Sequence, residues 1–283
     1  MTSDLDSAPR RDLLDRIERY YDAVPRSSAR AEDFGPLTLF VQEGAGWPYY
    51  GRPALGAAAG ATADDVERVR ARQRELGVPE AFEWVEETTP RLRAAVEATG
   101  LVVHAHPLMA LDLDAPAESG EPPRADGAVV RMLAADDPAL LGAVTVPYLA
   151  FAAPGTAVGE AGAPELAEQM RENSGSGAVE RVAGRIESGL TRVAAALEDG
   201  AVLCAGQHQP VGDVSEIVGV GTLPAARRRG LGLAVTAALA EDARARGVRT
   251  AFLSAGDDDV ARIYGRLGFR RIGTALIAEP AAQ

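Results

Sequence analysis

The residues that best combine chemistry with spacing form a short basic turn, Arg227-Arg228-Arg229-Gly230-Leu231-Gly232, ahead of an apolar helical pattern. Backbone N–H groups in the first turn of a helix have no partner inside the helix, and the helix dipole favours negative charge there. Gly230 and Gly232 let an anion approach the backbone closely, and the arginines add positive charge. The turn therefore predicts a diphosphate site. A solvated basic helix start is the alternative, because so short a motif recurs by chance.

Regular elements surround this turn and must position it. Before it, apolar alternation predicts three successive antiparallel strands; after it come a helix closed by Gly247, a strand, a further helix and a last strand. In the strand just before the turn, alternation places Glu216 and Val218 on the same face, so an acid lies on an otherwise apolar face. The predicted elements span residues 191–197, 201–207, 215–223, 227–246, 250–254, 259–267 and 269–277.

This segment resembles the GNAT superfamily of acyl-CoA N-acyltransferases. The resemblance is carried by the Arg-x-x-Gly-x-Gly turn, by Gly247, and by Ile263-Tyr264-Gly265-Arg266-Leu267-Gly268-Phe269, in the order and spacing of that family. It extends over residues 200–280 and, more loosely, over residues 128–200. It implies an α/β fold with a mixed sheet, and acetyl-CoA as co-substrate.

The resemblance also implies roles for single residues. Tyr264 matches the tyrosine that protonates the leaving CoA thiolate. Glu216 lies fourteen residues before Gly230, the first glycine of the turn, and matches the general base that some members place at that spacing. The alternatives are a Tyr264 that packs against CoA or the core and a solvated Glu216. The implied cofactor-binding residues, with the amides of 228–233 on the pyrophosphate and those of 222–223 on the pantetheine arm, are Thr222, Leu223, Arg227, Arg228, Arg229, Gly230, Leu231, Gly232, Leu233 and Asp257.

Asp257 is a departure from the family pattern, which often has Asn seven residues before the tyrosine. A carboxylate cannot donate a hydrogen bond as an amide does. The three acids Asp257 to Asp259 would instead suit the start of the helix that follows, where negative charge is favoured.

An internal repeat predicts how the chain is divided. Gly77 and Gly100 bracket a strand and a helix, as Gly247 and Gly268 do, which indicates two copies of an αβαβ half-domain. Chance recurrence of common elements is the alternative. The N-terminal copy lacks the turn and has Val96 where the other has Tyr264. We therefore predict a degenerate GNAT-like domain at residues 1–113, a linker at 114–127 and a catalytic domain at 128–283. Four aromatic residues of the first domain could line an acceptor site, although core packing explains them as well: Trp47, Tyr49, Tyr50 and Trp84.

Composition limits the partners and the compartment. The net charge of −12 over 283 residues excludes a general nucleic-acid surface and is compatible with a cationic amine, or simply with a solubilising surface. Cys204, the single cysteine, lies in an apolar run and is expected to be a buried, inert thiol. His104 and His106 share one strand face but have no third ligand nearby, so no metal is expected. With no signal-peptide pattern and no membrane-length apolar run, a soluble cytoplasmic protein is expected.

These observations predict an acetyl-CoA-dependent N-acetyltransferase with one cofactor site per chain. It would move an acetyl group to a primary amine of a small molecule or a peptide, by direct transfer in a ternary complex. The segment 148–173 is expected to determine the acceptor, and the oligomeric state is not readable. The alternatives are a non-catalytic acyl-CoA-binding sensor or scaffold, and a chain whose repeat provides an interaction surface.

Overall fold

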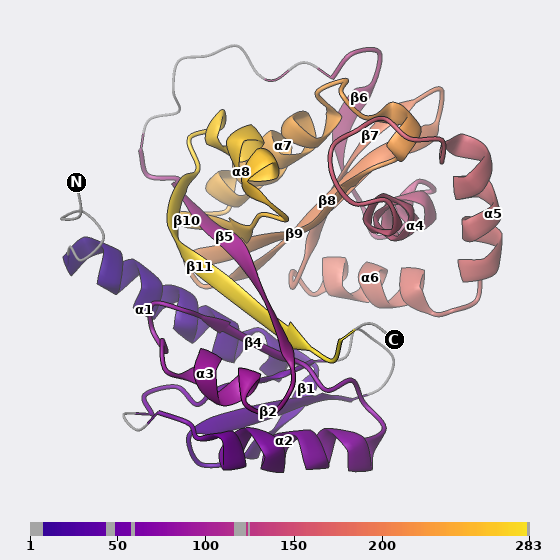
Figure 1. Cartoon of the computed structure of the whole chain (residues 1–283). Helices are drawn as coiled ribbons and strands as arrows, with labels where there is room; N and C mark the ends of the chain where they lie inside the picture. Colours follow the sequence, from indigo (N-terminus) through magenta and orange to yellow (C-terminus); the bar gives the residue numbers. More distant parts are fainter. Residues whose placement is uncertain (1–7, 44–48, 58–59, 116–122, 124, 282–283) are drawn as a thin grey trace. The chain divides into compact units, whose positions relative to one another are not determined.

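The computed structural model describes residues 8–43, 49–57, 60–115, 123 and 125–281. The chain divides into two compact units (Figure 1): unit 1 comprises Met1–Leu108 with Arg271–Gln283, and unit 2 comprises Met109–Arg270. Most of the predicted linker, and Trp47, lie outside the described residues. The three predicted domains stay predictions.

Unit 1 is a sheet with helices. Its strands follow the order β1-β2-β3-β4-β11. Adjacent strands run antiparallel except β3 and β4, which are parallel and register through Gly51↔Phe82. The elements are α1 (Ala8–Ala23), η1 (Pro25–Ser27), β1 (Ala29–Asp33), β2 (Leu37–Gln42), β3 (Gly51–Pro53), α2 (Ala63–Leu76), β4 (Phe82–Val85), α3 (Leu92–Glu97), the first part of β5 (Val102–Asp112) and β11 (Arg270–Glu279).

The core of unit 1 lies between α2 and the sheet. Phe82 and Trp84, alternate residues of β4, are buried against Val66 and Val69, which are three residues apart on α2. This is the pairing of a strand face with a helix stripe that the two periodicities allow. Leu276 of β11 completes the same cluster. The expectation of core packing is thereby confirmed for Trp84.

Unit 2 contains the segment that carries the GNAT-like motifs. Its sheet follows the order β10-β9-β8-β7-β6, antiparallel throughout except for β10 and β9, which are parallel. The elements are β6 (Val129–Leu133), α4 (Leu140–Ala152), α5 (Ala163–Asn173), α6 (Ala178–Glu187), β7 (Arg192–Glu198), β8 (Ala201–Val211), β9 (Val214–Thr222), η2 (Pro224–Ala226), α7 (Leu231–Ala245), β10 (Thr250–Ser254) and α8 (Asp258–Gly265).

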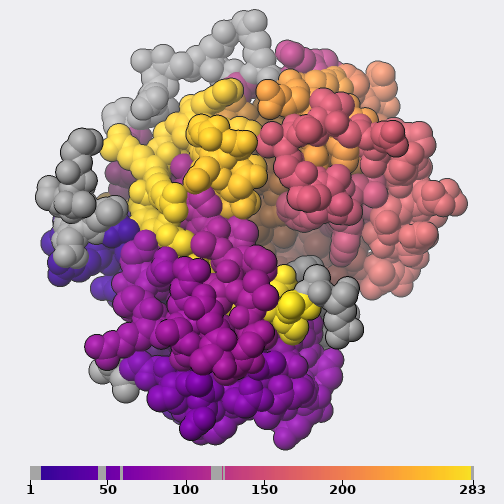
Figure 2. Space-filling model, in the orientation of Figure 1, coloured from indigo at the N-terminus to yellow at the C-terminus, as the bar shows by residue number. Residues whose placement is uncertain are grey.

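Helices cover both faces of the sheet in unit 2. A Cβ atom on Gly206 of β8 would lie 3.3 Å from the Leu239 side chain of α7, and one on Gly221 of β9 would lie only 2.8 Å from Ala150 of α4. Val220, next to Gly221, lies against Gly206, so α7 and α4 pack on opposite faces. The space-filling view shows α5 and α6 at the surface of this unit, in pink (Figure 2).

The predicted repeat appears in the order of elements, α2-β4-α3-β5 and α7-β10-α8-β11. The last strand of each copy nevertheless joins the other unit. β11 pairs with β4 in unit 1, and β5 passes into unit 2 at Met109, where β10 is its neighbour. Local periodicity identifies a strand, but it carries no information about which sheet that strand completes.

Three segments differ from what their local sequence predicts. Pro and Gly in residues 47–53 predict a loop, but Gly51–Pro53 is the strand β3, and Ala29–Asp33 is a strand that no local pattern predicts. The sequence also predicts a helix from about Pro138; this helix, α4, begins at Leu140 and continues through Pro147 to Ala152. For β3, pairing with β2 and β4 outweighs the local signal of Pro and Gly, and for α4, packing against Gly221 of β9 outweighs that of Pro147. For β1, pairing with the next strand, β2, decides the structure.

Candidate functional site

The site begins with the basic turn, which leads from β9 through η2 into α7. Arg228 has a φ of +66°, a conformation rare for a residue with a side chain, and Gly230, the N-cap of α7, has a φ of +75°. Across the part of the chain that the structure describes, the N–H groups of residues 228 to 233 have no hydrogen-bond partner recorded. These donors, at the positive end of a fifteen-residue helix, fit an anionic group.

The first arginine of the turn serves the protein itself. The Arg227 guanidinium donates to the carbonyl oxygens of Ala150 (2.9 Å), Ala153 (2.5 Å) and Ala157 (3.1 Å). It thereby satisfies acceptors at the end of α4, where helical carbonyls have no helical partner. Arg227 fastens this segment beside the turn and is committed to backbone acceptors.

The other two arginines differ from each other. Arg229 donates to the carbonyl oxygen of Asp126 at 2.6 Å and forms an ion pair with Glu198 at the end of β7. The hydrogen bond between the Arg229 and Glu198 side chains lowers the pKa of the Glu198 carboxyl and raises the pKa of Arg229. Arg228 is exposed and has no partner recorded among the described residues. Of the three predicted arginines, Arg228 is therefore the one available to a ligand.

Next to the turn, the parallel strands β9 and β10 share only a short register. The pairs run from Thr250↔Val214 to Phe252↔Glu216, although β9 continues to Thr222. A bulge interrupts β9 at Gly219, where the register with β8 shifts and φ is +65°. Strand backbone beyond the last pair is left without a partner strand in β10.

Thr222 and Leu223 end β9 at the turn. The Thr222 hydroxyl donates to the Cys204 sulfur at 3.2 Å, and the Leu223 N–H donates to the carbonyl oxygen of Leu203 at 2.9 Å. Cys204 is fully buried, as expected, and burial raises the pKa of its thiol to about 12. A thiol that stays protonated is a poor nucleophile, which agrees with the predicted inert role.

Tyr264 lies on α8 and is partly buried, with its ring centroid 6.1 Å from that of Phe269. Burial, and then the negative form of Cys204, raises the pKa of Tyr264 well above its ordinary value. The phenol therefore keeps its proton at neutral pH. It has no hydrogen bond recorded to any described residue, so its proton is available to another acceptor.

Glu216 is partly exposed in the middle of β9, between Gln209 of β8 and Phe252 of β10. Its neighbour Ser215 points toward α7, so Glu216 points to the face that α4 covers. Thr222 and Cys204, beside Tyr264, lie on the α7 face, because the Thr222 hydroxyl is within 3.5 Å of a Cβ atom built on Gly232. The two predicted catalytic residues thus approach the paired strands from opposite faces.

Asp257 is the N-cap of α8. Its carboxylate accepts a hydrogen bond of 2.8 Å from the N–H of Val260, and Asp258 and Asp259 follow in the first turn. The interpretation of these acids as a helix cap is confirmed. A contact of Asp257 with the pantetheine region stays a prediction.

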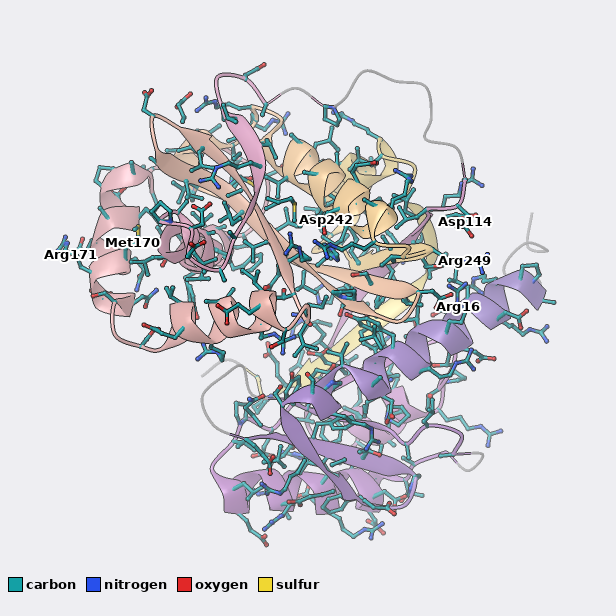
Figure 3. The ribbon with its side chains drawn as sticks, turned by 180° about the vertical axis from the view of Figure 1, so that it is seen from behind. Arg16, Asp114, Met170, Arg171, Asp242 and Arg249 are labelled. Atoms are coloured by element: carbon teal, nitrogen blue, oxygen red, sulfur yellow. The ribbon has the colours of Figure 1, made fainter. Side chains whose placement is uncertain are left out.

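A buried network that the sequence did not reveal supports this region. His208 of β8 bonds Ser215 through Nδ1 at 2.8 Å and Asp242 of α7 through Nε2 at 3.0 Å. Asp242 is labelled in Figure 3. Ser215 and His208 are fully buried, so neither of these two side chains can reach a substrate. Burial lowers the pKa of His208 despite the opposing effect of Asp242. In the sequence, the one sign of this network is Asp242, an acid at a position of the predicted helix that is next to apolar residues.

No metal centre is found within the described residues, where no group of three or more His, Cys, Asp and Glu side chains could hold an ion. His104 lies 3.8 Å from Glu279 in unit 1. Among the described helices, none combines the length and apolar character needed to cross a membrane.

Unit 2 thus combines a mixed sheet whose described parallel strands, β9 and β10, share three residue pairs with an open helix start at the end of β9, an arrangement that fits the resemblance to GNAT proteins carried by the motifs. Comparison with known proteins agrees: residues 197–277 match the family model described as FR47-like protein. The comparison with curated proteins found no match.

Solved structures extend the likeness to most of the chain. A GCN5-related N-acetyltransferase from Kribbella flavida superposes with a TM-score of 0.70 at 22% identity, over 95% of this chain and 96% of that one. A tandem GNAT protein from the clavulanic acid biosynthesis pathway gives 0.55 at 16%, over 87% and 79%. An N-acetyltransferase of the same kind from Sphaerobacter thermophilus gives 0.53 at 17%, over 95% and 86%. The predicted GNAT fold is confirmed, and tandem GNAT proteins share it.

Proposed function

We propose that this protein is an acetyl-CoA-dependent N-acetyltransferase that acts on a primary amine by direct transfer in a ternary complex. The observation that supports this most is the open start of α7, where the N–H groups of residues 228 to 233 have no partner among the described residues. Arg228 of the same turn is exposed, and Tyr264 is close enough to Cys204, which the Thr222 hydroxyl contacts, for the charge of Cys204 to affect its pKa.

The amides of residues 228 to 233 would hold the pyrophosphate of the co-substrate, with Arg228 adding a charge-assisted contact. Gly232 suits this role because it presents no side chain at the second position of the helix. The end of β9, beyond its last pair with β10, would hold the pantetheine arm through backbone groups. Acetyl-CoA supplies an activated acyl group as a thioester.

Proton transfer is assigned to two side chains of the protein. An alkylammonium must lose a proton before its nitrogen can attack, and Glu216 would accept that proton. Tyr264 would donate its proton to the departing thiolate. The raised pKa of Tyr264 suits this role, because the phenol is protonated before the reaction at any physiological pH.

Thiol release tests the proposal. The protein would be incubated with acetyl-CoA and a panel of primary amines, and free CoA thiol would be measured. We expect Tyr264→Phe to lower kcat about 100-fold, the lower range for a general acid, with the calorimetric Kd for CoA unchanged. The matched control is Tyr49→Phe in unit 1, which also removes one hydroxyl, bonded to Ser28 at 3.1 Å.

The result also separates the enzyme from a non-catalytic sensor or scaffold. Stoichiometric binding of acetyl-CoA without amine-dependent thiol release would favour the sensor and overturn the proposal. Turnover that Tyr264→Phe leaves unchanged would remove that residue from the mechanism. No CoA binding in calorimetry would leave the repeat as an interaction surface.

A further inference from the structure

A pocket lies entirely within unit 1 and has no part in the proposed acyl transfer. Its volume is about 700 Å³. Four segments line it: α1, the start of β2 with the residue before it, the chain at and after the end of β3, and the chain that follows β4. The residues that give it polar character are Asp15, Glu18, Arg19, Thr88, Thr89 and Arg91.

The pocket lies where a ligand site is expected in this kind of sheet. β3 and β4 are parallel neighbours; Pro53 is the last residue of β3, and Thr88 follows the carboxyl end of β4. Crevices outside the carboxyl ends of parallel strands are the common ligand sites of open α/β sheets. In unit 2 the basic turn occupies the corresponding place after β9, so each unit has its opening at the end of its parallel pair.

The arginines of unit 1 indicate the charge of a ligand. Every described arginine of this unit has an ion pair, hydrogen bond or other interaction, with two exceptions, Arg19 and Arg91. Both exceptions are exposed, and both line the pocket. Two guanidinium groups without protein partners at one opening suit a carboxylate, which they can hold through several hydrogen bonds.

The acids of the pocket are not equivalent. Glu18 has 12% of its side chain exposed and is already engaged by the buried Arg52 and by the Thr88 hydroxyl at 2.6 Å. Asp15 is exposed and has no partner recorded among the described residues. Asp15 lies on α1 four residues before Arg19, so one carboxylate and two guanidinium groups without recorded partners among the described residues line the same pocket, which suits a ligand that carries both signs of charge.

The same opening does not suit an acyl-CoA. The helix that starts beside it, α2, has a closed N-terminus: the Thr62 hydroxyl accepts from the N–H of Asp65 at 3.3 Å, and the Asp65 carboxylate accepts from the N–H of Thr62 at 2.8 Å. With Asp64 also in the first turn, a pyrophosphate would meet negative charge instead of free donors.

We propose that the pocket of unit 1 binds a free amino acid or a zwitterion of similar size. Arg19 and Arg91 hold its carboxylate, and Asp15 faces its ammonium group. This assignment does not depend on the proposed acyl transfer, because every residue involved belongs to unit 1.

Calorimetry and thermal unfolding of the full chain test this site, with the free amino acids that occur in proteins as probes. We expect at least one of them to bind, with its deaminated acid and its decarboxylated amine each at least tenfold weaker. Arg91→Gln and Arg19→Gln should each weaken binding at least tenfold. The control is Arg93→Gln on α3, two residues away, whose guanidinium pairs with Glu97 and Glu86 and does not line the pocket.

Two outcomes would overturn the site. One is that none of the probes binds or stabilises the protein. The other is binding that Arg19→Gln and Arg91→Gln leave unchanged, which would place the amino acid elsewhere, for instance as an amine acceptor in unit 2. Circular dichroism of each variant separates lost binding from lost folding. Gly232→Asp, which targets the acyl-CoA turn, should leave amino-acid binding intact.

Discussion

Helices α2 and α7 have the same place in the two units, but the first backbone N–H groups are capped in α2 and have no recorded partner among the described residues in α7. Both helices follow the first strand of a parallel pair and precede the second. In α2, Thr62 and Asp65 exchange hydrogen bonds and satisfy the first amides from within. In α7, Gly230 and Gly232 stand at the N-cap and second positions, and the amides stay without a recorded partner across the described residues. A few side chains at a helix start, with the fold unchanged, therefore decide whether it can receive an anion.

The difference continues at the other residues that chemistry would need. Val96 of α3, fully buried in the core of unit 1, occupies the place that Tyr264 has in α8. Glu83 of β4 corresponds to Leu253 of β10, which is buried. Unit 1 thus has an apolar residue at the tyrosine position and an acid where unit 2 has an apolar one. Repeated elements conserve their packing while their polar positions diverge.

The largest effect is expected when an acid is placed at the start of α7, where α2 already has one. Gly232 is the second residue of its helix, as Asp64 is of α2. Gly232→Asp should weaken CoA binding at least about 100-fold, roughly 3 kcal/mol, because a carboxylate would face the pyrophosphate. Isothermal calorimetry of CoA binding measures this loss.

The control for that change is Gly232→Asn, which has the same shape without the charge. Space allows both side chains, because the nearest atom to a Cβ at this position is the Thr222 hydroxyl oxygen, 3.5 Å away. We expect Gly232→Asn to lose less than tenfold. Equal losses for Asp and Asn would show that bulk, rather than an open positive helix end, controls binding.

The second way to sharpen the comparison concerns Glu83. Burial raises the pKa of Glu83 to about 7, although Arg52 opposes this. The folded protein holds that proton up to about pH 7, while the unfolded chain releases it near its ordinary value of 4.5. Unit 1 should therefore lose stability as pH rises from about 4.5 to 7 and change little above that.

Replacing Glu83 with Gln removes the ionisation and, like Leu253 in unit 2, leaves a neutral side chain. We expect Glu83→Gln to stabilise unit 1 by about 2 kcal/mol at pH 8 and by little at pH 4.5. Urea unfolding followed by tryptophan fluorescence reports on this unit, because both tryptophans precede residue 109. Glu43→Gln, which changes an exposed acid in the same unit, is the control. A gain that does not depend on pH would assign the effect to packing.

The sequence predicted the elements whose signals are local. Helix α2 is predictable from Thr62 to Gly77, because a Thr N-cap and a Gly C-cap both act within a few residues, and both caps are present in the structure. The strand–turn–helix order around α7 followed from apolar periodicity and glycine. By contrast, β3 is three residues long and exists because β2 and β4 flank it, which no local pattern encodes.

The parts of the site that the backbone forms could be predicted from the sequence, whereas the partners of its side chains could be predicted less well. The open amides of residues 228 to 233 follow from a helix start without a capping side chain. That Arg227 would hold three carbonyls around the end of α4, and Arg229 would pair with Glu198, depends on contacts 31 to 77 residues apart. The same holds for the bonds of His208 with Ser215 and Asp242.

The smallest expected effect comes from opening α2. Thr62→Ala removes the hydroxyl that accepts from Asp65 and should cost unit 1 about 1 kcal/mol, the usual value of an N-cap. Thr62→Ser keeps the hydroxyl and should cost a few tenths at most. Urea unfolding by tryptophan fluorescence measures both. The variant should still bind CoA at one site per chain, because Asp64 and Asp65 keep the helix start negative and unit 1 has no glycine turn. A second CoA site in Thr62→Ala would show that the cap alone had closed α2, and the contrast with α7 would then reduce to one hydroxyl group.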